Sequence, residues 1–408
     1  MKSNFSKGLL MTALITGSVI WGGTNVFAEE LQEYTLDQMV VTATRTEKRD
    51  VEVPASTEIL THDKILASGA TNAMEALSKV NGLEFKSYFP GGSAMTTMTP
   101  EINIRGLSTG TLVLVNGNPL NLNNKYVIDA IPVESIEKIE IIKGGGSILY
   151  GSEAMAGVVN IITKKTANNS VSIGYGNYGQ QKYNVSVGND KLKVNYDLKK
   201  WGEVNNLSAS ANPPTSSAYQ YSQDRNHKEN IGIGYNITDN LSFEYNHLDS
   251  SVDYHRNKII SNAFEQWRET YTKQDLFQLN YNSDSVKAHM WYTQNKINYY
   301  GGSKPGVYTR NTLTETKNAT YGLDVQKDIS LSEKSLLTVG ANAKKEKYEP
   351  QIIKGDSAKS SDKKERNQFA VFAQLDQKFT DKDNLIIGGR GTWTSGSTNG
   401  EEYDDFSA

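Results

Sequence analysis

Apolar and polar residues alternate with a period of two through the C-terminal half of the chain. The first run covers Val171 to Tyr175, and the pattern recurs until Leu385 to Gly389, which makes eleven runs in all. This period is typical of β-strands that have one apolar face. The sequence therefore predicts eleven strands, most of them near the ~9–11 residues that a tilted strand needs to cross a membrane.

The connections between these runs differ in length on the two sides of the predicted sheet. Short turns follow the even-numbered strands, and only the first odd connection, near residues 178–181, is also short. The other odd connections are long and polar, at residues 204–228, 250–272, 298–317 and 349–365. This asymmetry is typical of outer-membrane barrels, so we predict a transmembrane antiparallel β-barrel. A mean hydropathy of −0.54 agrees, because barrel strands average out hydrophilic.

The N-terminus has the pattern of an export signal. Lys2 and Lys7 flank the start of an apolar stretch at 8–23, and Val26-Phe27-Ala28 offers a small-residue cleavage site. This stretch of sixteen residues falls short of the ~20 that span a bilayer as a helix. Residues 1–28 are therefore predicted to be a signal peptide, with an uncleaved anchor as the alternative.

Residues 45–167 have a different pattern, of mixed helices and strands. Helices are predicted at 61–67 and 72–80, the second with Asn72 and Glu75 at the N-cap and N3 positions. Strands are predicted at 101–105, 111–116, 136–142 and 158–163. An α/β segment of this size must fold in the periplasm or inside a barrel, and 22-stranded barrels hold such a plug in the lumen.

Three motifs of this segment resemble the plug of TonB-dependent outer-membrane receptors. Ile104-Arg105-Gly106 resembles the I-R-G signature, Leu112 to Gly117 resembles the following strand and turn, and the block SIEKIEIIKGGGSILYGSEAMAGVVNIITKK (residues 135–165) resembles the most characteristic plug sequence. Asn116, Lys138, Gly145 and Asn81 depart mildly from the family pattern. The resemblance implies a 22-stranded barrel in the cell outer membrane, with the N-terminal α/β domain as its plug.

A further short segment resembles the TonB box, which in the family pairs edge-on with the periplasmic coupling protein TonB. It consists of Asp37, Gln38, Met39, Val40, Val41, Thr42 and Ala43. The resemblance also implies structural plug residues, namely Arg105, Gly106, Glu137, Glu140, Lys143 and Gly151. We expect Arg105 to pair with Glu137 or Glu140 in the plug interior.

The family's ligand-facing loops correspond to residues 88–98 and 121–126. Their candidate contacts are Tyr88, Phe89, Met95, Met98, Asn121, Asn123, Asn124 and Tyr126. Aromatic rings and amides suit a bulky iron chelate, so the expected function is active transport of a ferric siderophore, with cobalamin or haem as alternatives. Calcium-dependent binding is not expected, because the stretch 204–228 contains only one acidic residue, Asp224. A passive porin or adhesin is the alternative of another class.

Other function classes are excluded by composition and spacing. A net charge of −3 offers no basic field for nucleic acid, and the absence of cysteine excludes disulfides and thiolate sites. Gly174, Gly176 and Gly179 spell a dinucleotide motif, but no helix pattern follows them. The five histidines lack metal-ligand spacing. We therefore expect no enzyme activity and no resident cofactor, with iron only as cargo, and a monomer in contact with outer-membrane lipid.

The predicted domains are a signal peptide at 1–28, a TonB-box segment at 29–44, a plug at 45–167 and the N-terminal half of a barrel at 168–408. Single-chain bacterial barrels have an even number of strands, and eleven is odd. The remaining strands of a 22-stranded barrel would need about as many residues as the barrel part at 168–408 already has. The sequence therefore predicts a truncated receptor or a fragment of one.

Overall fold

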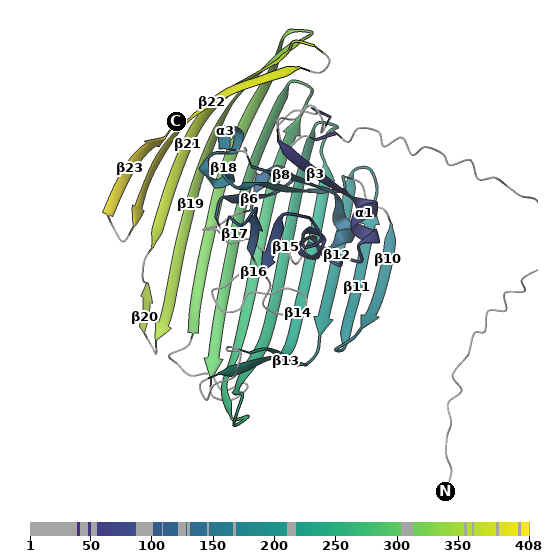
Figure 1. Ribbon diagram of the computed structural model, residues 1–408, viewed down its shortest axis with the longest axis vertical. Coiled ribbons are helices and arrows are strands. Elements are labelled where there is room, and N and C mark those ends of the chain that lie inside the picture. The colour runs from purple at the N-terminus through teal and green to yellow at the C-terminus, as the bar shows by residue number, and fades with distance from the viewer. Residues whose placement is uncertain are drawn as a thin grey trace, which may run out of the picture. The chain divides into compact units, whose positions relative to one another are not determined.

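A computed structural model gives the arrangement of residues Asp37–Ala408, which form one compact unit. Within that unit the structure describes residues 39–40, 48–49, 55–86, 101–107, 109–120, 128, 131–144, 147–165, 169–209, 218–302, 313–354, 357–360, 363–380, 383–398 and 401–407. Two parts follow each other along the chain: a small mixed domain and a large antiparallel sheet (Figure 1). No described helix is long and apolar enough to cross a membrane.

The large sheet has fourteen strands, twelve of which follow one another as neighbours in sequence order. These twelve are β10 (Ser170–Gly176), β11 (Gln180–Gly188), β12 (Leu192–Trp201), β14 (Tyr219–Asn236), β15 (Leu241–Lys258), β16 (Phe264–Asn282), β17 (Val286–Gly302), β18 (Leu313–Ser332), β19 (Ser335–Lys354), β21 (Lys364–Lys378), β22 (Asn384–Thr398) and β23 (Glu401–Ser407). Two short strands, β13 (Val204–Ala209) and β20 (Ser357–Ser360), pair with β14 and β19. The predicted transmembrane antiparallel barrel wall is confirmed in its architecture.

The structure corrects the predicted strand count and strand lengths. All eleven predicted strands are present, but β23 pairs with β22 as a twelfth, and its sequence EEYDDFS has no apolar alternation that could predict it. Strands β14 to β19 are 17–20 residues long, so much of the predicted polar loops at 204–228, 250–272, 298–317 and 349–365 is strand. Hydrogen-bonded pairing continues past the apolar band, because polar side chains do not interrupt a backbone ladder.

A row of aromatic rings crosses the outward face of the sheet. Tyr245, Phe277, Tyr292 and Tyr321 stand on β15, β16, β17 and β18, with ring centroids 4.6, 6.0 and 4.9 Å apart along the row. Exposed apolar side chains such as Leu323 share this face. An outward apolar band bordered by aromatic rings is how a barrel wall meets a bilayer interface. We call these four residues the aromatic row.

The mixed domain has a five-stranded sheet in the strand order β3-β8-β9-β6-β7, a separate two-stranded sheet of β4 and β5, and short helices. Its elements are β3 (Ser56–Thr61), α1 (His62–Ala67), α2 (Ala73–Leu77), β4 (Leu83–Lys86), β5 (Glu101–Ile104), β6 (Thr111–Val115), β7 (Asn118–Pro119), η2 (Val133–Ser135), β8 (Ile136–Lys143), α3 (Ser147–Tyr150), η3 (Ser152–Ala154) and β9 (Gly157–Thr163). Strands β6 and β9 are parallel and almost wholly buried, so both read as continuous apolar runs. The main core includes Met74, Leu77, Ile104, Val113 and Ile139.

Helix α2 begins where the cap signal predicts. The Asn72 side chain accepts a hydrogen bond from the Glu75 backbone N–H at 2.9 Å. The Glu75 carboxylate turns back and accepts from both the backbone N–H and the hydroxyl of Thr71, at 2.8 and 2.9 Å. These bonds satisfy donors that a helix N-terminus leaves free. The two predicted helices and four predicted strands of this domain are confirmed, with ends shifted by up to three residues.

Gly157 is the position where the mixed domain is least tolerant of a side chain. Its φ is +153°, and a Cβ atom there would lie 2.1 Å from the Ile142 carbonyl oxygen and 2.8 Å from Ile104 Cδ1. Gly157→Ala is therefore expected to lower the free energy of unfolding of this domain by about 3 kcal/mol. The urea concentration at which half of this domain becomes susceptible to proteolysis, measured on the full chain, reports this change in stability.

Gly69→Ala is the matched control for this substitution. Gly69 also has a positive φ, +71°, but nothing lies within 4 Å of its Cβ position, so only the backbone cost of about 1 kcal/mol remains. Equal losses in the two variants would show that the close approach of β9 to β8 does not limit this position.

Candidate functional site

The mixed domain is attached to the inner face of the sheet on the side of β11 and β12. The Lys199 ammonium donates a hydrogen bond to the Thr71 carbonyl oxygen, and the Lys193 ammonium donates to the Lys164 carbonyl oxygen. Lys182 forms an ion pair with Glu134. Lys199 and Lys193 are buried, so their charges depend on these partners. Side chains of the wall thus hold the backbone of this domain.

A second contact joins the β6–β7 turn to β15 and β16. The Asn116 amide donates to Thr163 Oγ1 at 2.9 Å and to Glu244 Oε2 on β15 at 2.5 Å. On β16, Gln278 donates to the Val115 carbonyl oxygen at 2.8 Å. An aspartate in place of Asn116 would set one carboxylate against another here. Asn116, which departs from the family pattern, is therefore the residue type that suits its partner Glu244.

A third contact is a partly buried cluster of four charges between η3 and the strands β19 and β21. The Lys344 ammonium donates to both carboxylate oxygens of Glu153 at 3.0 Å. Arg366 donates from Nη2 to Glu153 and from Nε to Glu346, at 2.5 Å each, and Lys344 is 3.1 Å from Glu346. We call these four residues the Glu153 cluster. Burial alone would raise the pKa of the Glu153 carboxyl, but Lys344 and Arg366 outweigh it and hold that pKa below its usual value.

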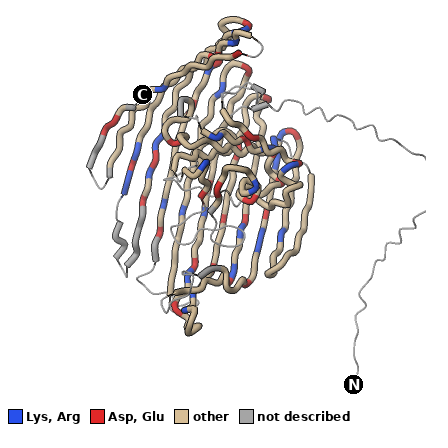
Figure 2. Tube along the Cα trace, in the orientation of Figure 1, with Lys and Arg blue, Asp and Glu red and all other residues tan. Residues whose placement is uncertain are grey.

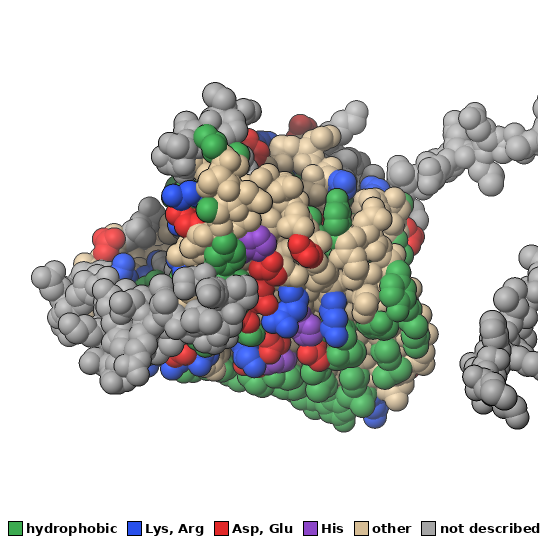
Figure 3. Space-filling model, turned by 90° about the horizontal axis from the view of Figure 1, so that it is seen from below, with side chains coloured by type: hydrophobic (Ala, Val, Ile, Leu, Met, Phe, Trp, Pro, Cys, Tyr) green, Lys and Arg blue, Asp and Glu red, His purple; other side chains and the backbone are tan. Residues whose placement is uncertain are grey.

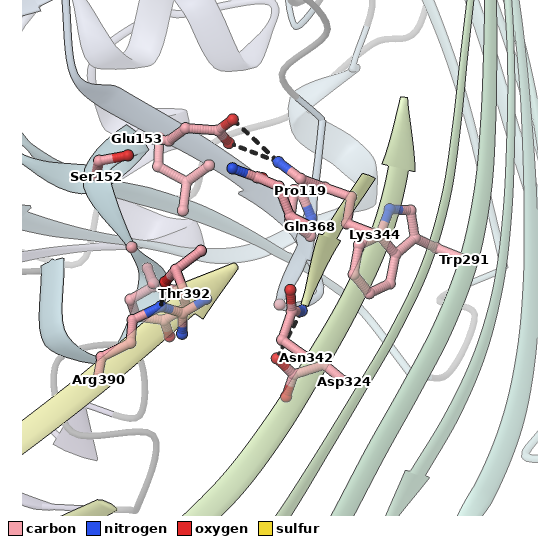
Figure 4. A pocket seen from close by; sticks show the side chains of 14 residues that line it. Pro119, Ser152, Glu153, Trp291, Asp324, Asn342, Lys344, Gln368, Arg390 and Thr392 are labelled. Atoms are coloured by element: carbon pink, nitrogen blue, oxygen red, sulfur yellow. Dashed lines mark hydrogen bonds and ion pairs between the residues drawn. The ribbon is translucent and has the colours of Figure 1, made fainter. Parts of the chain in front are cut away.

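A small cavity lies beside the Glu153 cluster (Figure 4). It is lined from the mixed domain by residues that include Tyr150, Gly151 and Glu153, and from the wall by Trp291, Asp324, Asn342, Lys344, Gln368, Arg390 and Thr392. Its volume of about 50 Å³ holds three to five water molecules, at the ~10–15 Å³ that one water requires. A metal chelate does not fit, so this cavity is a polar seam rather than a ligand pocket.

A larger surface of a different kind lies farther along the same inner face. On β15, the contact residue Glu244 and the residues Tyr254 and Arg256 are separated by even numbers of positions, with continuous register, so all three side chains point inward. The same parity on β16 places Arg268 on the face of Gln278. Ten strand residues separate these two, which is roughly 33 Å. The inner face beyond the mixed domain therefore carries two arginines.

Tyrosines surround both arginines. The Arg256 guanidinium lies 4.4 Å from the ring centre of Tyr219, and the Arg268 guanidinium lies 5.1 Å from that of Tyr299. Tyr254 is buried at 3% exposure and packs with Val252, Leu207 and Tyr221. We call Arg256, Arg268, Tyr219, Tyr221, Tyr254 and Tyr299 the Arg–Tyr cluster.

The two arginines of this cluster differ in their partners. Arg256 is neutralised by Glu265, whose carboxylate lies 2.8 Å from its Nε. Arg268 has no carboxylate partner in the described part of the chain, and its buried Nη1 has no hydrogen-bond partner there. This nitrogen packs over Gly301 of β17, where a Cβ atom would lie 1.7 Å from it, so the side chain depends on the glycine for its position. The cluster therefore offers the half-buried rings of Tyr219 and Tyr299, and a guanidinium charge that no described carboxylate neutralises, to an anionic, aromatic molecule.

Several residues predicted for ligand and partner binding lie outside the described residues. This holds for Tyr88, Phe89, Met95, Met98, Asn121, Asn123, Asn124 and Tyr126, and for Asp37, Gln38, Val41, Thr42 and Ala43 of the predicted box. Met39 and Val40 form the short strand β1 (Met39–Val40), which pairs with β2 (Lys48–Arg49). These ligand and box assignments stay predictions.

The predicted structural residues are brought together only in part. Lys143 pairs with Glu58 at 2.7 Å and also donates to the Asn81 carbonyl oxygen. Gly151 has a φ of +85°, and a Cβ there would lie 3.5 Å from Arg390 Nε. Both residues help to fix the domain or its contact with the wall.

The expected ion pair of Arg105 is wrong. Arg105 is exposed with a φ of +52°, next to Gly106 with a φ of +76°. Glu137 is exposed, and buried Glu140 pairs instead with Lys138 at 2.7 Å. The physical reason is strand parity: Lys138 and Glu140 share one face of β8, two residues apart.

The sequence pattern missed the Arg–Tyr cluster, because its residues lie in stretches that were predicted to be loops. The signal that could have found it is strand parity. Tyr254 and Arg256 continue the inward-facing positions of the strand predicted at 241–245, and Arg268 continues those of the strand predicted at 277–281. The Glu153 cluster was also missed, since 191 residues separate Glu153 from Lys344.

Comparison with known proteins relates the mixed domain to one family. Residues 49–158 match the model of the TonB-dependent Receptor Plug Domain. The vitamin B12 transporter BtuB of Vibrio vulnificus is 34% identical over 186 residues, which cover 44% of this chain and 29% of that protein. The chain thus spans less than a third of the length of this relative.

Solved structures resemble the whole described unit. The ferripyoverdine receptor of the outer membrane of Pseudomonas aeruginosa, bound to ferripyoverdine, matches with a TM-score of 0.63 at 15% identity, over 90% of this chain and 55% of that one. The siderophore receptor PiuA of Acinetobacter baumannii matches with a TM-score of 0.61 at 12% identity, over 91% and 62%. At these identities the likeness shows the fold: a plug domain attached to part of a barrel.

Proposed function

This chain is a member of the TonB-dependent receptors, and we propose that it binds a ferric siderophore at the cell surface for active transport across the outer membrane. Receptors of this family are proteins of the outer membrane, and that is where this barrel wall belongs. The wall's outward apolar band and aromatic row suit that location. The family contains transporters and receptors rather than enzymes.

The Arg–Tyr cluster is the observation that carries the siderophore assignment. Ferric chelates of catecholate or carboxylate groups are bulky and anionic, and many are aromatic. Arg268 carries a guanidinium charge without a carboxylate partner in the described part of the chain, and the half-buried ring of Tyr299 lies beside it. Charge-assisted hydrogen bonds to a guanidinium are stronger than neutral ones, and the ring faces add stacking. The predicted plug contacts, among them Tyr88 and Asn121, would approach the same ligand from the plug.

Energy coupling by TonB is the second part of the proposal. The segment of residues 37–43 is β-prone, and Met39 and Val40 already pair with β2 as an extended strand. A segment that takes extended backbone near the N-terminus of the plug suits β-strand addition to a partner. Ligand binding above the plug and a pull on this segment below it would together open a path along the polar seam.

Cobalamin is the second candidate ligand, and the similarity to the vitamin B12 transporter BtuB favours it. The vitamin B12 transporter BtuB is 34% identical over 186 residues of this chain. That identity covers 44% of the chain, however, and the matched plug family lies at residues 49–158, whereas the Arg–Tyr cluster lies at 219–299. Binding of a ferric catecholate, cobalamin and haem to the purified full chain separates the candidates.

Arg268→Gln tests the cluster directly. Because the substitution removes the guanidinium charge and its donors, we expect the affinity for the ferric catecholate to fall about 10- to 100-fold, which corresponds to the ~1.5–3 kcal/mol of a hydrogen bond to a charged group. Affinity for cobalamin should stay within about twofold. Fluorescence quenching titrations with the two ligands measure both values.

Arg225→Gln is the matched control for this prediction. Arg225 lies at a similar height on β14, but its side chain is 60% exposed and pairs with Asp253 on the other face of the wall. Its substitution should leave the affinity for the ferric chelate unchanged. Tight cobalamin binding without any binding of the ferric chelate would contradict the siderophore assignment and support the second candidate.

A further inference from the structure

Three side-chain amides form a row across the inner face of the wall. They are Gln274 on β16, Asn295 on β17 and Asn318 on β18, and we call them the amide row. Gln274 is directly opposite Asn295, which is directly opposite Asn318. Residues directly opposite each other project to the same face, and Gln274 shares strand parity with Gln278, which donates to the plug. The three amides therefore point inward.

The amide row lies between the plug and the Arg–Tyr cluster. On β16, Gln274 is four residues from Gln278, which contacts the plug, and six residues from Arg268 of the Arg–Tyr cluster. These separations are about 13 and 20 Å along the strand. Leu276, between Gln274 and Gln278, belongs to the hydrophobic core of the plug. A ligand that moved from the Arg–Tyr cluster toward the plug would therefore pass the amide row.

The amides are buried, yet several of their polar atoms have no hydrogen-bond partner in the described part of the chain. Gln274, Asn295 and Asn318 are 6%, 0% and 3% exposed. The unpaired atoms are Nε2 of the glutamine and both polar atoms of each asparagine amide. Thr293 and Thr320, opposite each other beside the row, are also buried with unpaired hydroxyls. Nearly all buried polar atoms in folded proteins are hydrogen-bonded, so this concentration of unpaired atoms indicates a function.

The amide row is neutral. Figure 2 shows basic positions in the middle of β16 to β18. Lys296 and Lys317 are adjacent to the asparagines in sequence, but strand parity directs both lysines to the outer face. Glu346, directly opposite Thr320, is already paired with Arg366. Charge is found at the surface, where Figure 3 shows charged side chains beside a hydrophobic area. The groups that fit the row are therefore neutral ones that donate and accept, namely amides and hydroxyls.

We propose that the amide row is a second binding site for the transported chelate and takes the neutral amide and hydroxyl groups of its backbone. The inference rests on the proposed transport function. The row is inaccessible in this closed arrangement, so it acts after the plug has moved, when the chelate leaves the Arg–Tyr cluster. Hydrogen bonds to the row then replace those that the chelate loses, which lowers the barrier to its passage. The unpaired amides also destabilise the closed plug, which favours its release.

The test replaces both asparagines of the full chain, by Asn295→Val and Asn318→Val. Valine suits a strand and needs no hydrogen-bond partner, so the urea midpoint for proteolysis of the plug should equal or exceed that of the intact chain. Affinity for the ferric catecholate at the cell surface should stay within about twofold, because the Arg–Tyr cluster is unchanged. The uptake rate should fall about tenfold, as expected when the moving ligand loses one or two neutral hydrogen bonds.

Two further variants separate hydrogen bonding from packing. Gln294→Val replaces an exposed amide of β17 that points to the outer face, and it should leave uptake unchanged. Asn295→Ser with Asn318→Ser keeps a donor and an acceptor at each position, so it should recover most of the uptake that the valine variant loses. A purely structural role would give the opposite order, because the smaller serine side chain leaves more empty space than valine.

Three results would overturn the proposal. These are normal uptake by the valine variant, a loss of uptake in proportion to lost plug stability, and equal losses in the valine variant and the Gln294→Val control. Cobalamin uptake is measured in parallel, because cobalamin also carries amide groups. If the intact chain took up cobalamin and not the ferric chelate, the proposed siderophore function would fail. The same comparison of variants with cobalamin would then still decide the role of the amide row.

Discussion

Deletion of residues 37–43 is expected to abolish uptake of the ferric chelate while its binding at the cell surface stays within about twofold of the intact chain. The segment lies outside both the Arg–Tyr cluster and the Glu153 cluster, so ligand contacts remain. The proposed transport requires a pull, which a β-strand added to the partner would transmit through its backbone hydrogen bonds. Uptake and surface binding of a radiolabelled ferric chelate, measured in the same cells, give the two values.

Deletion of residues 29–35 is the matched control, because it also removes seven residues from the same region but spares the segment 37–43. It should leave uptake near the level of the intact chain. If cells with the 37–43 deletion took up the chelate normally, the chain would act as a passive porin, and the coupling proposal would be wrong. Loss of binding together with uptake would instead point to a folding defect.

The plug was predictable from its sequence because its elements depend on local signals. Asn72 and Glu75 are spaced as cap and N3 residue, and the buried strands β6 and β9 read as apolar runs. The wall was predictable only where lipid selects apolar side chains. Beyond that band, β14 to β19 continue with polar residues on both faces, and β23 has no apolar alternation. Backbone hydrogen bonds form there whatever the side chains are, so the hydropathy pattern does not predict these parts of the strands.

The candidate site was harder to predict than the fold, because it depends on strand register. Arg268 and Tyr299 are neighbours only because β16 and β17 pair with Thr270 opposite Tyr299. Local spacing along the sequence cannot give such pairings. The failed prediction for Arg105 has the same origin, since the partner of Glu140 was set by the parity of β8. Once the register is known, parity alone assigns the Arg–Tyr cluster to the inner face.

Glu153→Gln is expected to raise the rate at which the plug opens away from β19 and β21 by about 100-fold. The substitution leaves Lys344, 8% exposed, and Arg366 with only one carboxylate, Glu346. Removing the carboxylate that buried Lys344 shares with Arg366 costs about 3 kcal/mol, which corresponds to that factor. The chain has no cysteine, so Ala154→Cys, at a fully buried position, gives a single reporter thiol. Its labelling rate at neutral pH measures the opening.

The same cluster predicts how the closed plug responds to acid. The pKa of Glu153 is held below its usual value: burial opposes this, but Lys344 and Arg366 prevail. A lowered pKa stabilises the closed state at every pH above the carboxyl's ordinary pKa of about 4.3. That contribution is lost as the pH falls through the lowered pKa. Hydrogen exchange at 152–163, corrected for its intrinsic rate, should therefore be constant from pH 7 to 5 and rise below about pH 4.

Glu365→Gln is the control that separates plug release from a general loss of charge. Glu365 is next to Arg366 on β21, but it faces outward and pairs with Lys345 and Lys347. The labelling rate of the reporter thiol should stay within about twofold of the parent, because exposed ion pairs contribute ~0–1 kcal/mol. The rise in hydrogen exchange at 152–163 below about pH 4 should be absent in the Glu153→Gln variant, because that variant lacks the carboxyl that titrates. Equal labelling rates in the Glu153→Gln variant and the parent would mean that the plug opens from the lysine side, at β11 and β12, and leaves the Glu153 cluster closed.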